Sequence, residues 1–413
     1  MYGRLIAAAG LLLIAGAAGA TNGYFLEGYG TNTKAQAGVG IALPLDALTI
    51  ATNPAGLTQI DDAVTGGLEI FRPRRSSTLV QDGQSEEFDG NDTQTFYLPE
   101  IGFSRHFNER LAGGIALYGN GGLDTNYGSN PFARFGAQGP AGVDLEQAFL
   151  SPALAFKINE SNSLGAALNI AYQRFESKGI GLFANFSDAP ANVSNRGHDD
   201  STGVGVRLGW LGQVGDYVTL GATWQSKTHM GRFEKYSGLF ADAGSFDIPE
   251  TYGLGVAIKP NKDWSIGLDW QRILYSQVSA VGNPINVLFS GVALGASDGP
   301  GFGWQNISVI KLGGSYAFNE AVTLRAGWSK SQQPVPASQT FFNILAPGVI
   351  ETHLTAGANW KLANRNSIGV AWVHAFNHTV NGSGSIPPAF GGGEANISLV
   401  EDSLALSFTH GLK

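Results

Sequence analysis

Fourteen segments of this chain alternate apolar and polar residues with period two, and this alternation limits the folds open to it. Because successive side chains of a β-strand point to opposite faces, each segment is expected to form a strand with one apolar face. Seven long and six short connections alternate between the segments, which is typical of a closed antiparallel membrane barrel with both chain ends on the periplasmic side. The predicted strands are 63–75, 95–105, 110–119, 144–157, 162–175, 201–213, 216–228, 247–259, 263–277, 303–318, 320–331, 350–363, 365–378 and 398–410.

The composition fits strands that face lipid on one side. Only 14% of the residues are charged, and 58 are Gly. Within 263–277 the large apolar residues share one parity and the small or polar residues share the other. The two sets are Trp264, Ile266, Leu268 and Trp270, and Ser265, Gly267, Asp269 and Gln271. A soluble β-sandwich or propeller also has period-two strands, but such folds seldom alternate long and short connections, and no blade-like repeat is present.

The first twenty residues have the pattern of an export signal. Arg4 precedes an apolar run over 5–18, and Ala18-Gly19-Ala20 is the small-x-small pattern of a cleavage site. We expect cleavage after Ala20 and a mature chain that begins at Thr21. A membrane anchor is the alternative, but the apolar run is shorter than the roughly 20 residues that a spanning helix needs. The chain has no Cys, so it carries neither disulfides nor thiolate metal sites.

Residues 21–62 do not alternate, and they are too apolar for a disordered linker. We therefore expect this segment, called the hatch below, to fold inside the barrel as a plug. The predicted organisation is a signal peptide over 1–20, an N-terminal hatch over 21–62 and a transmembrane β-barrel over 63–413.

The hatch contains Asn53-Pro54-Ala55, and here the chain resembles the FadL family of outer-membrane channels for long-chain fatty acids and other hydrophobic compounds. In that family the hatch bears an Asn-Pro-Ala motif. Further stretches similar to the family follow in the same order along the chain. They are Asp144-Leu145-Glu146 with the strand pair that ends at Ala171-Tyr172, Ile248-Pro249-Glu250, Trp264 with Tyr275-Ser276-Gln277, and Pro334-Val335-Pro336-Ala337.

The resemblance implies a transport route. Substrate is captured on extracellular loops, passes to a site inside the barrel near the hatch N-terminus, and leaves sideways through a gap at an inward kink of the third strand. Here the third predicted strand runs into Gly119-Asn120-Gly121-Gly122, where residues without Cβ can bend and interrupt a ladder. We interpret this run as the kink. The alternative is that these glycines only open the second long loop.

Two of the long loops carry the same apolar tetrad, Gly-Leu-Phe-Ala, at 181–184 and 238–241. Exposing Leu and Phe to water is unfavourable by roughly 1.5 to 3 kcal/mol per side chain relative to burial. These loops are therefore expected to pack on a ligand or on each other. The predicted capture groove consists of Leu182, Phe183, Phe186, Leu239 and Phe240, and the alternative is that the loops cap each other without a ligand.

For the interior ligand site, the hatch offers Phe25, Leu26, Tyr29 and Leu48 as lining residues. A buried carboxylate needs a basic or polar partner. By parity the candidates for this anchor are Arg207, Lys311 and Arg325. They could instead pair with Asp269 or Asp46 and seat the hatch. At the positions aligned with the basic site residues of fatty-acid carriers this chain has Gly179 and Gln305, which favours the alternative of an uncharged alkane or aromatic hydrocarbon.

Other functions have weaker support in the sequence. No nucleophile motif, phosphate loop or metal-ligand cluster is present, so we predict no catalytic residue, no cofactor and no metal. A general porin would lack the apolar hatch, and an adhesive barrel would not need the loop tetrads. The acidic net charge of −8 disfavours nucleic acid. We predict a monomer in the outer membrane of a Gram-negative bacterium, with membrane lipid and a hydrophobic small molecule as partners and passive uptake as its function.

Overall fold

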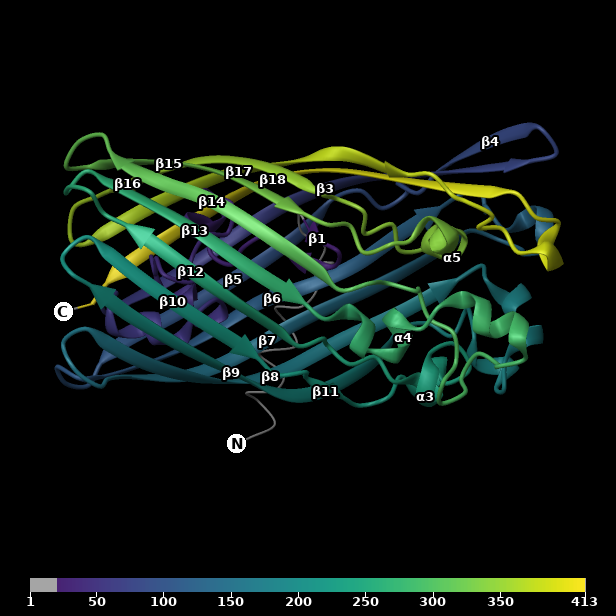
Figure 1. Ribbon diagram of the computed structural model, residues 1–413, viewed down its shortest axis with the longest axis horizontal. Coiled ribbons are helices and arrows are strands. Elements are labelled where there is room, and N and C mark those ends of the chain that lie inside the picture. The colour runs from purple at the N-terminus through teal and green to yellow at the C-terminus, as the bar shows by residue number, and fades with distance from the viewer. Residues whose placement is uncertain (1–20, 413) are drawn as a thin grey trace.

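The structure is a computed structural model, and it describes residues 21–412. The predicted signal peptide over 1–20 lies outside the described residues. Fourteen long antiparallel strands form the wall, and they tilt around a common axis (Figure 1). They are β3 (Ala63–Gln81), β5 (Phe96–His106), β6 (Leu111–Tyr127), β7 (Ala141–Lys157), β8 (Asn162–Lys178), β9 (Asp199–Val214), β10 (Val218–Gln225), β12 (Thr251–Ile258), β13 (Trp264–Ile273), β14 (Ile307–Ala317), β15 (Val322–Ser331), β16 (Thr352–Lys361), β17 (Asn366–Val380) and β18 (Glu394–Gly411).

The last wall strand closes onto the first. β18 pairs with β3 from Gly411 opposite Ala63 to Glu394 opposite Val80, without a register shift. The predicted closed fourteen-stranded barrel is thereby confirmed. Short turns gather at the end of the barrel that holds the C-terminus, and long loops with short helices cover the other end (Figure 1). We call these the short-turn end and the long-loop end.

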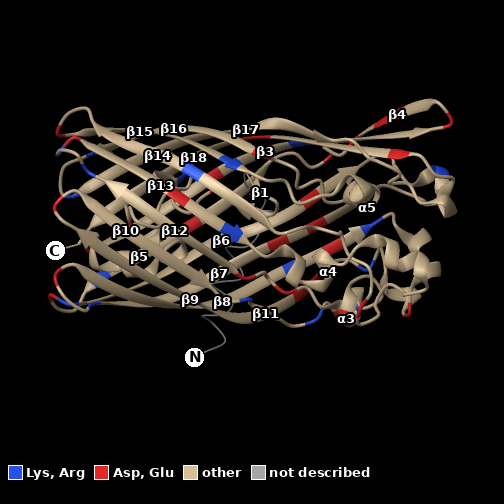
Figure 2. Ribbon diagram, viewed as in Figure 1, with Lys and Arg blue, Asp and Glu red and all other residues tan. Residues whose placement is uncertain are grey.

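The two faces of the strands are also as predicted. On β13, Trp264, Ile266 and Leu268 are 44–45% exposed on the outer face, whereas Gly267 and Asp269 are buried inside. Outward apolar side chains at this density suit a lipid environment. Figure 2 shows Asp, Glu, Lys and Arg at the turns, at the loops and on some wall strands. No helix within 21–412 is long and apolar enough to cross a membrane.

Several strand boundaries differ from the prediction, such as the end of β6 at Tyr127 and the start of β14 at Ile307, and two of the differences have a clear local cause. β3 extends to Gln81 and forms a hairpin with β4 (Gln84–Asp89), a strand that we did not predict. Asp82 and Gly83 turn this hairpin with φ of 52° and 75°, and an Asp-Gly pair is a common signal for such a turn. The predicted strand 263–277 ends at Ile273, because Asn306 Oδ1 accepts hydrogen bonds from Ser276 N and Oγ at 2.9 Å and draws the chain into a 3-10 turn.

The remaining elements are short. In the hatch they are β1 (Thr21–Asn22), β2 (Phe25–Leu26), α2 (Thr31–Lys34), η1 (Ala47–Ala51) and η2 (Pro54–Thr58). In the long loops they are η3 (Ala133–Phe135), η4 (Gly181–Phe186), η5 (Pro190–Asn192), β11 (His229–Met230), η6 (Glu234–Tyr236), α3 (Ala241–Gly244), η7 (Tyr275–Gln277), α4 (Ser279–Gly282), η8 (Ile285–Ser290), η9 (Ala337–Gln339), α5 (Thr340–Asn343) and η10 (Pro388–Phe390).

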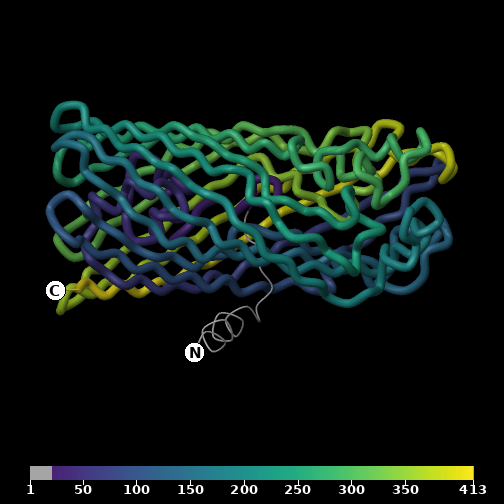
Figure 3. The backbone as a smooth tube through the Cα atoms, turned by 90° about the horizontal axis from the view of Figure 1, so that it is seen from below, coloured from purple at the N-terminus to yellow at the C-terminus, as the bar shows by residue number. Residues whose placement is uncertain are grey.

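The hatch lies inside the barrel, where its purple trace is surrounded by wall strands (Figure 3). An ion-paired group holds it: Lys34 Nζ lies 2.6 Å from Glu69 Oε2 and 3.3 Å from Glu100 Oε2. All three side chains are at most 6% exposed. Burial opposes the charge of Lys34, but Glu100 and Glu69 together raise the pKa of this lysine above its ordinary value. The hatch is therefore fixed to β3 and β5 by buried charges.

Candidate functional site

The wall has a gap between β5 and β6. These strands pair only from His106 opposite Ala112 to Ile101 opposite Leu117. Beyond this point β5 continues to Phe96 in register with β3, and β6 continues to Tyr127 in register with β7. The two strands therefore separate towards the long-loop end, and no hydrogen-bonded ladder joins them there.

The glycine run of β6 lies where the strands part. The register of β6 against β7 shifts between Gly119 and Gly121, and Asn120 is the extra residue of this bulge. The Asn120 side chain is buried, and its Nδ2 donates to Gln147 Oε1 at 3.1 Å. Because the strand continues to Tyr127, the alternative in which the glycines only open a loop is wrong.

The N-terminal hairpin of the hatch, formed by β1 and β2, lies against β6 at this gap. Phe25 pairs with Gly121, and Gly122 N donates to Tyr24 O at 3.1 Å. A Cβ on Gly121 would lie 1.9 Å from Tyr24 O, so only glycine permits this approach. The hairpin therefore takes the place of part of the missing β5 ladder.

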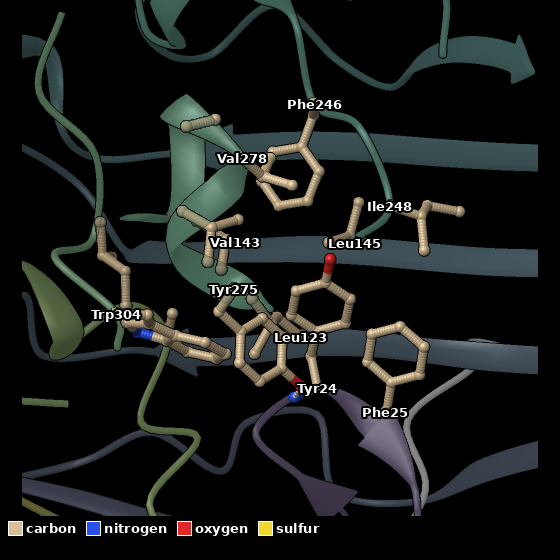
Figure 4. Packing of buried hydrophobic residues seen from close by; sticks show 14 of the residues in the cluster. Tyr24, Phe25, Leu123, Val143, Leu145, Phe246, Ile248, Tyr275, Val278 and Trp304 are labelled. Carbon is tan, nitrogen blue, oxygen red and sulfur yellow. Dashed lines mark hydrogen bonds between the residues drawn. The ribbon is translucent and has the colours of Figure 1, made fainter. Parts of the chain in front are cut away.

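Aromatic rings surround the hairpin on its other side (Figure 4). The ring of Tyr24 lies 5.2 Å from Tyr275, 5.8 Å from Trp304 and 6.2 Å from Phe246, measured between centroids. Phe25 stacks on Tyr24 at 5.3 Å. Burial raises the pKa of the Tyr24 and Tyr275 hydroxyls, so both rings stay neutral. We call these five residues the aromatic cluster.

A polar cavity of about 30 Å³ adjoins the aromatic cluster, with Phe25 shared between them. Five of the seven predicted interior residues line it, namely Phe25, Leu26, Tyr29, Arg207 and Lys311. The volume is about that of one water molecule. The site is therefore closed to an acyl chain in this conformation, and a ligand needs the hairpin or the rings to move.

The structure places the other two predicted residues elsewhere. Leu48 packs in η1, against Gly30 and near β5, and does not line this cavity. Arg325 lines a cavity of about 830 Å³ at the short-turn end together with Asp46. Arg325 lies too far towards the short-turn end for the interior site, because it is only three residues into β15.

The basic residues of the site have no carboxylate partner among residues 21–412. Lys311 Nζ donates to Glu27 O at 2.5 Å, and Arg207 donates to Thr52 O and to Gln225 Oε1. The predicted ion pairs with Asp269 and Asp46 do not form. Asp269 Oδ2 instead accepts from Gly40 N and Ile41 N at 2.8 and 2.9 Å. Lys311 and Arg207 touch the hatch through backbone carbonyls, and Asp269 and Glu27 line the same cavity beyond ion-pair distance from them.

The two loop tetrads are not brought together into one groove. Phe183 packs among the rings of Phe132 and Phe342, whereas Phe240 packs against Phe175 and Phe246. The loops do meet, since Ser187 Oγ donates to Gly238 O at 2.7 Å. Leu182, Phe186 and Leu239 are partly buried against the same core. Only the second tetrad reaches the aromatic cluster, through Phe246.

The predicted hatch motif fixes the hatch to the wall. Asn53 caps η2 by accepting from Ala55 N at 3.1 Å, and its Nδ2 donates to Ile41 O at 2.7 Å and to Trp210 O at 3.0 Å. Pro54 and Ala55 are buried or nearly so beside wall glycines, and a Cβ on Gly209 would lie 1.9 Å from Asn53 Oδ1. The motif is therefore a structural anchor.

Replacing Asn53 with Ala is expected to lower the free energy of hatch opening by about 3 kcal/mol, because a helix cap is lost and two buried carbonyls lose their donor. Hydrogen exchange of the hatch amides, followed by mass spectrometry, measures this free energy. Asn159→Ala is the control, since Asn159 also accepts a backbone hydrogen bond but in an exposed turn. Equal exchange in the two variants would contradict an anchoring role.

The comparisons with known proteins agree with this architecture. The family model described as "Outer membrane protein transport protein (OMPP1/FadL/TodX)" matches residues 11–385. The chain belongs to this family. It is accordingly an outer-membrane β-barrel protein of a Gram-negative bacterium, and the long-loop end of its barrel is the extracellular one.

Individual members of the FadL/TodX family cover most of the chain. The long-chain fatty acid transport protein of Escherichia coli (strain K12) is 22% identical over 402 residues, which cover 84% of this chain and 86% of that protein. A Pseudomonas aeruginosa FadL homologue superposes with a TM-score of 0.72 at 18% identity, over 95% of this chain and 100% of the other. The P. putida toluene transporter TodX gives a TM-score of 0.68 at 17% identity, over 94% and 99%. At these identities the structures support the fold alone.

Sequence reasoning missed three rings of the site, those of Phe246, Tyr275 and Trp304. Tyr275 was assigned to a wall strand, and Trp304 was placed at the start of another. Both stand in the long loop between β13 and β14, where their rings pack on each other and on Tyr24 of the hatch. The sequence does contain a signal for these rings. An aromatic cluster on the lumen side needs rings from the loops, and η7 and Trp304 both lie in the connection between β13 and β14.

Proposed function

We propose that this protein takes up long-chain fatty acids or similar hydrophobic molecules passively, by capture at the extracellular loops, binding inside the barrel and lateral release beside β6. The gap between β5 and β6 carries this proposal. It is the place where the described wall lacks a ladder between neighbouring strands, and a hatch hairpin rather than a wall strand covers it. A closed porin-type wall would have no such opening.

The path to the gap is apolar. Phe240 of the second loop tetrad packs on Phe246, which lies 5.0 Å away between centroids, and Phe246 packs on Tyr24 of the hatch. An acyl chain gains about 0.8 kcal/mol for each CH₂ that leaves water, so such a path draws the ligand inwards without an energy source. Movement of Tyr24 and Phe25 would then expose the gap. This movement requires that the ligand binds the open state more tightly than the closed one.

The basic side chains of the cavity offer hydrogen-bond donors to an acid. Lys311 and Arg207 line one cavity with Glu27 and Asp269, and neither base forms an ion pair within residues 21–412. A ligand carboxylate there would receive charge-assisted hydrogen bonds. The Phe25 ring belongs to the aromatic cluster and also lines this cavity. A fatty acid whose carboxylate binds Lys311 and whose acyl chain lies among the rings would contact both the cavity and the aromatic cluster.

Equilibrium binding of oleic acid and of its methyl ester to the purified barrel tests the proposal. We expect preference for the free acid, and we expect Lys311→Met to weaken binding of the acid about tenfold while leaving the ester unchanged. Lys361→Met is the control, because Lys361 is exposed at the short-turn end.

The other outcomes discriminate between substrates. Equal binding of acid and ester by the unaltered protein would favour the alternative of an uncharged alkane or aromatic hydrocarbon, and it would leave Lys311 and Arg207 as supports of the hatch. If neither ligand binds, the uptake proposal is wrong.

A further inference from the structure

The residue that follows the predicted cleavage site is held by a buried glutamate. Thr21 N donates to Glu401 Oε2 at 2.8 Å, and Thr21 Oγ1 donates to Glu401 Oε1 at 3.0 Å. Thr21 is 4% exposed and Glu401 is 2% exposed. Thr21 begins β1 of the hatch, and Glu401 lies on β18 of the wall, so this contact joins the hatch to the last wall strand.

Glu401 lacks a cation. Among residues 21–412 no Lys, Arg or His nitrogen forms an ion pair with it, and the nearby Arg75 of β3 pairs with Asp124 at 2.6 Å instead. A buried carboxylate without a positive partner is costly, and a peptide N–H and a hydroxyl compensate its charge only in part. The position of Thr21 N shows where a compensating charge would fit.

Cleavage of the signal peptide would supply that charge. Hydrolysis of the bond between Ala20 and Thr21 adds one water, and it leaves a carboxylate on Ala20 and an ammonium on Thr21. We infer that Glu401 is the binding site for the ammonium group of the mature amino terminus, so that processing itself creates a buried ion pair between hatch and wall. In the precursor the same nitrogen is an uncharged amide.

This ion pair lies across the gap from the other attachment of the hairpin. The hairpin is bound to β18 through Glu401 at one end and to β6 through Gly121 and Gly122 at the other. In the wall, β3 and β5 lie between β18 and β6. The hairpin therefore bridges the lumen side of the gap, and the ammonium fixes it in the closed position. The ion pair is independent of any ligand, whereas its role in closing an exit rests on the proposed function.

The experiment separates the charge of the amino terminus from the hydrogen bond of a peptide N–H. One variant is Glu401→Gln. The second keeps Glu401 but carries one Asn inserted between Ala20 and Thr21, which restores the peptide N–H of Thr21 and displaces the ammonium by one residue, about 3.8 Å along the chain. Asn is not accepted before the cut, so cleavage stays after Ala20. Glu87→Gln on β4 alters an exposed acid and is the control.

Hydrogen exchange of amides 23–28 is measured on the full mature proteins in detergent without ligand. We expect exchange about tenfold faster or more in both variants, as loss of a charge-assisted bond predicts, and no change in the control. Intact mass is expected to show that the unaltered protein begins at Thr21.

Three results would overturn the inference. They are a mature chain that begins elsewhere, unaltered exchange in Glu401→Gln, and unaltered exchange in the inserted variant, which would show that a peptide N–H suffices. Because no ligand is present, failure here leaves the uptake proposal untouched, and failure of the binding experiment leaves this one untouched.

Discussion

Replacing Gly121 with Ala will detach the hatch hairpin from β6 and strengthen binding of a long-chain fatty acid about tenfold. A Cβ at this position would lie 1.9 Å from Tyr24 O, well inside contact distance, so the carbonyl must move away and carry Tyr24 and Phe25 with it. Because the ligand binds only after the hairpin has moved, weakening the closed position by about 1.4 kcal/mol raises the apparent affinity about tenfold.

The control for this prediction is two residues away on the same strand. A Cβ on Gly119 would lie 3.6 Å from Leu98 Cδ2, an ordinary contact, so Gly119→Ala is expected to resemble the unaltered protein. Equilibrium binding and hydrogen exchange of amides 21–26 are measured in both variants. Fast exchange with unaltered affinity in Gly121→Ala would mean that the hairpin is not part of the ligand site. Unaltered exchange would mean that its contact with β6 does not hold it.

Replacing Lys34 with Met is expected to lower the free energy of hatch opening by about 3 to 5 kcal/mol, because Glu69 and Glu100 are left buried and unpaired. The hydrogen bonds that Gly30 N and Thr31 N donate to Glu100, at 3.1 and 3.0 Å, remain and make the loss partial. Exchange of the hatch amides measures the change. Lys361→Met, at an exposed lysine, is the control.

Two further measurements test the ionic origin of this effect. Adding Glu69→Gln to Lys34→Met removes one unpaired charge and is expected to restore part of the stability. Because the pKa of Lys34 is raised in the folded protein, its contribution is complete below about pH 10 and is lost only at higher pH. A double variant no more stable than Lys34→Met would show that packing, rather than charge, is what Lys34 provides.

The wall was predictable because it follows a local rule. Alternation at Trp264, Ile266 and Leu268 predicted a strand, its outer face and its position in the strand order without information from any other strand. The strand ends were less predictable where one side chain decides them, as Asn306 does for β13. The Asp82-Gly83 turn was readable from the sequence, but its hairpin extends beyond the apolar pattern that we followed.

The ligand site was predictable only in part because it is assembled from distant segments. Parity placed Arg207 and Lys311 correctly in the lumen, yet parity has no information on height, and Arg325 lies near the short-turn end instead. The loop rings depend on how loops cross one another. Phe183 and Phe240 occupy equivalent places in identical tetrads, and they are buried in different groups of rings.

The closure of β18 onto β3 has a consequence for biogenesis. The strand made last completes the enclosure of the segment made first, and the hatch is fitted too closely to enter afterwards, since wall glycines such as Gly209 leave no room for even a methyl group beside Asn53. The machinery that inserts this barrel must therefore keep β18 and β3 apart until the wall has formed around the hatch. A slowly folding hatch would then delay release of the whole protein into the membrane.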